Sequence, residues 1–137
     1  MEQQTVVKNE TPSTMEEIFL KWADTHDIKY VAEDAVFKNL GTGEEYKGRE
    51  AIGGMLHYMY HVAFDAYAEV TNYIITEDKA MLEGFFKGRH IGEFAGIEPT
   101  NKEVNVPLCV SYNLKDGLIK EGRVYMLGNV LMQQLNA

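Results

Sequence analysis

The sequence is poor in residues that cross-link or interrupt a chain. It contains one cysteine, Cys109, and three prolines among 137 residues. A lone cysteine excludes an internal disulfide and is typical of a reducing compartment, so we expect a cytoplasmic protein. No apolar run approaches the roughly 20 residues needed to cross a bilayer. The polar segment 1–13 lacks the apolar core of a signal peptide.

Basic residues are also scarce. Thirteen Lys and Arg residues stand against 21 Asp and Glu, which gives a net charge of −8. Nucleic acids and anionic membranes are bound mainly through basic patches, so we expect neither as a partner. The length fits one domain. We therefore expect a flexible tail over 1–13 and a single domain over 14–137.

The spacing of apolar residues changes in the middle of the chain. Apolar positions recur at helical intervals over 15–23 and again over 49–64, and a short helix is expected at 130–135. Between the last two helices the period is two, and Lys115-Asp116-Gly117 is a hairpin signal. This order predicts an α+β domain, with helices packed on one face of a curved, mainly antiparallel sheet. The expected strands cover 67–76, 80–94, 104–114 and 118–127.

Glycine is concentrated in one of these strands. Side chains in a strand point alternately to opposite faces. Over 81–94, one face carries the charged residues and the other carries only glycines and bulky groups. Glycine in a strand marks a bend, a bulge or the close approach of a ligand. We therefore interpret His90, which shares its face with Phe86 and Phe94, as a polar group on the wall of an apolar pocket.

The same region carries a family resemblance. Residues 88–102 read G-R-H-I-G-E-F-A-G-I-E-P-T-N-K. This run resembles the G-T-H-x-G-x-F-x-G-I-x-P-T-G-K signature of the SnoaL-like polyketide cyclases, in the nuclear transport factor 2-like superfamily. D-G-L-I-K-E at 116–121 is similar to the family's D-G-K-I-x-E, and Q-Q-L at 133–135 to its closing x-Q-L-G. The resemblance implies a cone-shaped α+β barrel with a deep apolar pocket, commonly in a homodimer.

Two positions depart from the family pattern. The resemblance places an acid/base aspartate on the strand before the D-G turn, and that position is Val110 here. The family also tends to have aspartate soon after the tyrosine of the last strand, where this chain has Met126 and Leu127 after Tyr125. Classical cyclase chemistry would therefore need other groups.

A reaction beside a carbonyl without a cofactor needs a base and a donor for the enolate oxygen. We expect His90 and Glu121 to handle protons and Tyr125 to donate. Glu121 matches the family's own glutamate, and an apolar surrounding would raise its pKa. The alternative is structural: His90 hydrogen-bonds a neighbour, Glu121 pairs with Arg123 or Arg89, and Tyr125 is a core aromatic.

Other residues are expected to line the pocket. His57 and His61 project from one side of a helix, but no His-Glu spacing motif accompanies them, so we expect no metal and no cofactor. Dehydratases of the superfamily use a histidine pair with tyrosines and an aspartate, so we add Tyr30 and Asp34 to the candidate pocket-lining residues. The expected pocket-lining residues are Trp22, Tyr30, Asp34, His57, Tyr58, Phe86, Phe94, Val106, Leu108, Val110, Tyr112 and Arg123.

Two functions fit these features. The first is a cofactor-independent enzyme that cyclises, isomerises or dehydrates a small, largely apolar carbonyl compound of polyketide or steroid type. The second is a non-catalytic domain that binds a small molecule or serves as a dimeric scaffold, which the missing aspartate favours. The expected outer sheet face mixes charges with Phe85 and Ile91, a composition that suits a homodimer contact.

Overall fold

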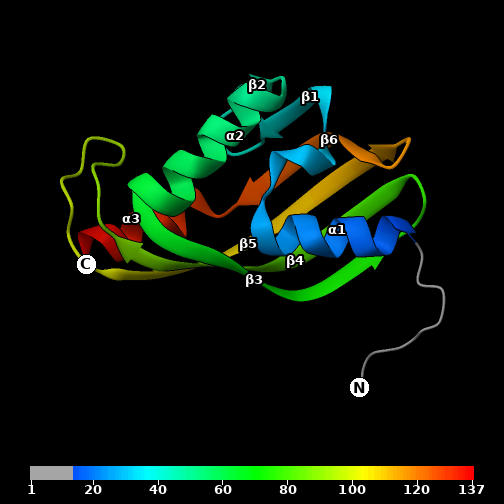
Figure 1. The fold of residues 1–137 in the computed structure, drawn as a ribbon. Helices are drawn as coiled ribbons and strands as arrows, with labels where there is room; N and C mark the ends of the chain where they lie inside the picture. Colours follow the sequence, from blue (N-terminus) through cyan, green and yellow to red (C-terminus); the bar gives the residue numbers. More distant parts are fainter. Residues whose placement is uncertain (1–13) are drawn as a thin grey trace.

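The computed structural model describes residues 14–137, so the expected tail over 1–13 lies outside the described residues. The described chain forms the predicted α+β fold, with three α-helices, two short helical segments and one sheet. In chain order the elements are α1 (Thr14–Thr25), η1 (Ile28–Tyr30), β1 (Val31–Asn39), β2 (Glu45–Lys47), α2 (Arg49–His57), η2 (Tyr58–Val62), β3 (Phe64–Ile75), β4 (Lys79–His90), β5 (Glu103–Lys115), β6 (Leu118–Met126) and α3 (Gly128–Asn136) (Figure 1).

The sheet has six strands in the order β2-β1-β6-β5-β4-β3 and does not close. Every neighbouring pair is antiparallel except β1 and β6, which run parallel. The turn between β5 and β6 has positive φ angles at Asp116 and Gly117, 54° and 78°. Two positive φ angles in succession fit the hairpin turn that the Asp-Gly pair predicts.

Two helices cover one face of the sheet. Figure 1 shows α1 and α2 on the same side, above the curved strands. Phe19 and Trp22 of α1 and Ile52 of α2 are buried, as are Phe37 and Tyr112 on the strands beneath. The core therefore lies between the helices and the inner face of the sheet. None of the helices within 14–137 combines the length and apolar character needed to cross a membrane.

The glycines of β4 are explained by the neighbouring strand. A Cβ added at Gly84 would overlap the carbonyl oxygen of Glu69, and one at Gly88 would overlap that of Asp65. Gly92, just beyond β4, would meet the carbonyl of Val62 in the same way. The backbone of the paired strand β3 and of the segment before it therefore lies too close to these glycines for any side chain. The close approach predicted from these glycines is made by a strand and not by a ligand.

Some boundaries differ from the sequence-based expectation. The helix expected over 49–64 ends at His57 and continues as the π-helical turn η2 (Tyr58–Val62). For the segment after the first helix, the sequence predicts a short helix or turn over 30–37 with a brief strand around 35–38, whereas the structure has the longer strand β1. This strand pairs with β2 on one side and β6 on the other. Such long-range pairing overrides local propensity, which is why the strand is longer than the local pattern predicts.

Strand β6 contains a bulge that changes which residues face inward. Asn113 of β5 pairs with Glu121, whereas the next residue, Leu114, pairs with Ile119, so Lys120 is extra. An extra residue shifts the alternation of faces by one. Ile119 is therefore buried on the inner face, while Glu121 lies on the outer face.

Candidate functional site

A cavity of about 980 Å³ lies between the helices and the inner face of the sheet. Its wall is made mainly of aromatic, methionine and aliphatic side chains from α1, α2, η2, α3 and the strands. This combination is typical of a small-molecule pocket. Seven of the residues that we expected to line a pocket lie here: Trp22, Tyr58, Phe86, Phe94, Leu108, Val110 and Tyr112.

A hydrogen bond between two buried aromatics organises this wall. The indole Nε1 of Trp22 donates to the hydroxyl oxygen of Tyr112 over 3.2 Å. Phe19 and Phe37 pack edge-on against Tyr112, with ring centroids 5.2 and 6.1 Å away. Burial raises the pKa of Tyr112, so the phenol stays protonated at neutral pH. Because its oxygen already accepts from Trp22, its own proton remains available to a ligand oxygen.

A second pair of polar groups, His26 and Tyr60, also borders the cavity. Their rings lie 4.7 Å apart, and the ring of His26 lies 5.2 Å from that of Trp22. Burial lowers the pKa of His26 to about 4, with a smaller contribution from His61. Burial likewise raises the pKa of Tyr60. Both groups are therefore uncharged at neutral pH.

Charged groups that line the cavity belong to the turn between β1 and β2 and its flanks. Glu44, an exposed residue, accepts hydrogen bonds from the hydroxyls of Thr42 and Tyr46. Lys38 forms an ion pair with Glu45 over 3.7 Å.

Val110 lies in the cavity wall. The position that corresponds to the family's aspartate is thus apolar, and the lining residues include no other carboxylate within the described chain.

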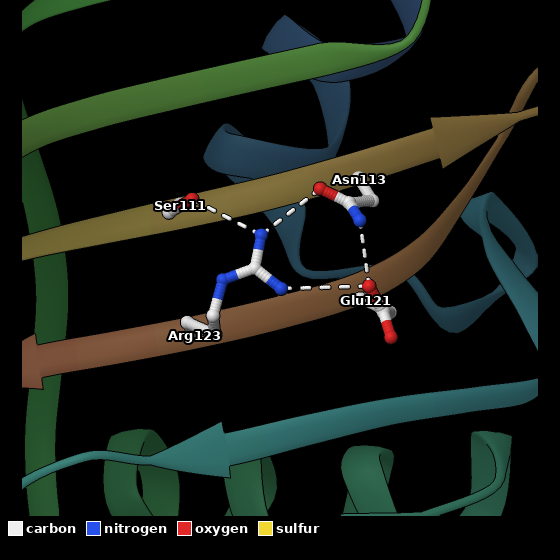
Figure 2. A network of polar contacts seen from close by, with 4 residues as sticks. All are labelled: Ser111, Asn113, Glu121 and Arg123. Carbon is white, nitrogen blue, oxygen red and sulfur yellow. Dashed lines mark hydrogen bonds and ion pairs between the residues drawn. The ribbon is translucent and has the colours of Figure 1, made fainter.

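Glu121 and Arg123 do not line this cavity. They lie on the outer face of the sheet in a network with Ser111 and Asn113 (Figure 2). Asn113 Nδ2 donates to Glu121 Oε1 over 2.6 Å, and Arg123 reaches the same oxygen at 3.4 Å. The expectation that Glu121 faces the pocket assumed uninterrupted alternation along the last strand, and the bulge at Lys120 reverses it.

His90 and Tyr125 are also placed elsewhere. Tyr125 is 47% exposed and follows the outward alternation of Glu121 and Arg123. His90 is 0% exposed, and its Nδ1 accepts the backbone N–H of Thr100 over 3.1 Å. This contact puts the proton on Nε2, which has no hydrogen-bond partner among the described residues. The ring packs on Phe64, with centroids 5.2 Å apart. The structure does not bring the three expected catalytic residues together, and their catalytic roles stay predictions.

The other expected lining residues have structural surroundings of their own. Asp34 is exposed and pairs with Lys120 over 2.5 Å, which holds the pKa of its carboxyl below the usual range. His57 is exposed, with its ring 5.6 Å from that of His61. Val106 is fully buried in the core, and Tyr30 of η1 packs against that core. Within 14–137, no three His, Cys, Asp or Glu side chains cluster as metal ligands would.

Sequence reasoning missed much of the wall. His26 is four residues beyond Trp22, a spacing that puts both side chains on one side of a helix. That spacing could have revealed it, as the broad apolar side of the 49–64 segment could have revealed Leu56 and Tyr60. The lining residues that were not expected include His26, Phe37, Tyr46, Leu56, Tyr60, Val124, Met126, Leu131 and Met132.

The open curved sheet, the covering helices and the largely apolar cavity between them define a small α+β cavity protein. The family model for the SnoaL-like polyketide cyclases matches residues 14–135. The chain therefore belongs to the SnoaL-like polyketide cyclase family. No curated protein sequence matches it significantly.

Solved structures support the same fold. A proposed SnoaL-like polyketide cyclase from Jannaschia sp. CCS1 is 17% identical, with a TM-score of 0.81 over 96% of this chain and 99% of that one. IdmH from Streptomyces antibioticus, a proposed polyketide cyclase, is 23% identical, with a TM-score of 0.73 over 93% and 100% of the two chains. AclR from Streptomyces galilaeus, a proposed hydroxylase, is 22% identical, with a TM-score of 0.74 over 92% and 87%. Identities this low establish the fold and leave the reaction open.

Proposed function

We propose that this protein binds a small, uncharged, largely apolar carbonyl compound and promotes its enolisation without a cofactor, as a step of cyclisation, isomerisation or dehydration. The observation that carries the proposal is the buried hydrogen bond from Trp22 to Tyr112. It leaves the phenol proton of Tyr112 free at the wall of an apolar cavity. A fixed donor in a low-dielectric site is what a developing enolate oxygen requires.

The step follows from this geometry. A base removes a proton from the carbon beside the carbonyl, and the electron pair of that C–H bond forms a carbon–carbon double bond. The carbonyl π electrons move to the oxygen, which then accepts the hydrogen bond of Tyr112. Return of a proton to carbon restores the base. The lining groups besides Tyr112 that can take up this proton are the carboxylate of Glu44 and the neutral imidazole of His26.

A second candidate function is binding without catalysis. It is favoured by the apolar Val110 at the position of the family's aspartate and by the lack of an inner carboxylate among the described lining residues. Under this alternative, Tyr112 still donates to the ligand carbonyl, but no proton leaves carbon.

Deuterium exchange distinguishes the two. Deoxybenzoin carries two exchangeable protons beside its carbonyl, and their replacement in heavy water can be followed by mass spectrometry. An enzyme accelerates the exchange, and Tyr112→Phe slows it by about a hundredfold, the effect of losing one oxyanion donor. Glu121→Gln, on the outer face, is the matched control and should retain the wild-type rate. Calorimetric binding of deoxybenzoin with exchange at the buffer rate would support the binding domain instead.

A further inference from the structure

Three polar side chains, Tyr112, Tyr60 and His26, border the same part of the cavity wall around Trp22. Tyr112 offers a proton because its oxygen is occupied by Trp22. Tyr60 offers another, since among the described residues its hydroxyl makes no hydrogen bond. The imidazole of His26 is a third polar group in this part of the wall, beside Trp22 and Tyr60. A neutral imidazole has one N–H donor and one acceptor nitrogen.

The backbone holds His26 in an uncommon conformation. His26 follows the end of α1, its N–H donates to Trp22 O over 2.7 Å, and its φ is 54°. This is the left-handed position after a helix, where glycine is the usual residue. Histidine costs free energy there. In return, the conformation sets the imidazole against Trp22 and Tyr60 on the cavity wall.

Neither ring nitrogen of His26 hydrogen-bonds to any part of the chain within 14–137. His26 is half-buried, and its ring borders the cavity, where the chain supplies no hydrogen-bond partner for it. Such a group in a cavity marks a place where a ligand atom completes the bond. We propose that His26 is the hydrogen-bond acceptor of the cavity, and that it selects carbonyl compounds which also carry a hydroxyl group.

The surroundings keep this acceptor uncharged. Burial is the main cause that lowers the pKa of His26 to about 4; the electrostatic influence of His61 acts in the same direction, and that of Asp24 opposes it. At pH 7 the ring therefore keeps one free nitrogen lone pair to accept from a ligand O–H. An uncharged ring also offers no ion pair to a carboxylate, so the favoured ligand is neutral at both of its polar ends.

This inference rests on the proposed function, because it adds a second contact to the Tyr112 carbonyl site. Two probes of nearly equal size separate the contacts: meta-hydroxybenzophenone and meta-methylbenzophenone. Both present a carbonyl to Tyr112, and the first alone presents a hydroxyl to His26. With the full chain at pH 7, calorimetry should show about tenfold tighter binding of the hydroxyl probe, the value of one hydrogen bond.

Variants of His26 then test whether this residue causes the tighter binding of the hydroxyl probe. His26→Phe keeps a ring and removes both nitrogens, so the tenfold ratio should fall to about one while the affinity for the methyl probe changes by less than about threefold. His26→Gly is a second test that the backbone tolerates, because a φ of 54° suits glycine. His61→Gln, a change at an exposed neighbour, should retain the ratio.

The outcomes are separable. A wild-type ratio near one, or a preference that persists in both His26 variants, overturns the role of His26. In either case, binding of the methyl probe that weakens in Tyr112→Phe would still support the proposed function. Failure of both probes to bind the wild-type protein would overturn the proposed function and this inference together.

Discussion

The indole N–H of Trp22 donates to the hydroxyl oxygen of Tyr112 over 3.2 Å and joins α1 to β5, 90 residues apart in the sequence. Both side chains are almost completely buried. The bond fixes the phenol against the helix and leaves its proton directed away from Trp22. One contact thus contributes to the packing of the helix on the sheet and to the polarity of the cavity.

Removing this hydroxyl should destabilise the protein. Tyr112→Phe leaves the Trp22 N–H buried without an acceptor, so the free energy of unfolding should fall by about 1–3 kcal/mol. Urea denaturation measures this loss. Tyr125→Phe is the matched control, because Tyr125 is exposed and its hydroxyl is not needed inside. Equal stability of Tyr112→Phe and the wild type would mean that the hydrogen bond is absent in solution.

The glycines of β4 give a sharper test of the fold. In Gly88→Ala the new methyl group would overlap the backbone of Asp65 and Ala66. We expect a loss of about 2–4 kcal/mol or a failure to fold, as for other severe steric changes. Gly54→Ala is the control: it lies in α2 with open space around it, so helix propensity predicts a gain of up to about 1 kcal/mol. A neutral effect of Gly88→Ala would contradict the close approach of the β3 backbone to Gly88.

The lowered pKa of His26 should make the stability of the protein depend on pH. Its pKa falls from 6.5 in the unfolded chain to about 4 in the folded protein. Between these values the unfolded state binds more protons, so stability is lost as the pH falls from 6.5 toward 4. The slope from this group approaches about 1.4 kcal/mol per pH unit. His26→Phe should lose that component, which is measured as the difference between the two denaturation series. Parallel curves for both proteins would show that the His26 ring is solvated.

His90 is expected to hold a loop. Its Nδ1 accepts the Thr100 N–H, and its backbone exchanges hydrogen bonds with Asn101 and Lys102. His90→Leu should therefore speed amide hydrogen exchange at Thr100 by at least about tenfold, the effect of losing one hydrogen bond. Affinity for carbonyl probes should change little, since His90 is not in the cavity wall. If amide exchange at Thr100 is unchanged and ligand binding is lost, His90 takes part in ligand binding and does not hold the loop.

The sequence predicted the fold well because its signals are local. Helical spacing, period-two strands and the Asp116-Gly117 turn are each set by neighbouring residues. The β1 strand was predicted too short, as a brief strand around 35–38, because its N-terminal half is held by partners distant in sequence. The orientation of Glu121 was mistaken because one bulged residue, Lys120, reverses a strand face without leaving a strong mark in the sequence.

The site was harder to predict than the fold. Tyr112 and Val110 lie on the inner face of β5, as their spacing predicts, because this strand alternates without interruption. His26 was missed because its position depends on a left-handed residue after α1, a conformation that the sequence more often signals with glycine. His90 was expected in the pocket because it lies on the same inner face of β4 as Phe86. The rings of Phe64, Phe86 and Phe94 decide which part of that face is open, and only packing reveals this.

The central claim is that the cavity binds a carbonyl oxygen at Tyr112. Infrared difference spectroscopy of bound benzophenone measures this contact directly, because a hydrogen bond lowers the stretching frequency of a carbonyl. We predict a lower frequency in the wild-type complex than in an apolar solvent, and a return toward the solvent value in Tyr112→Phe. An identical carbonyl frequency in the two complexes would contradict the account.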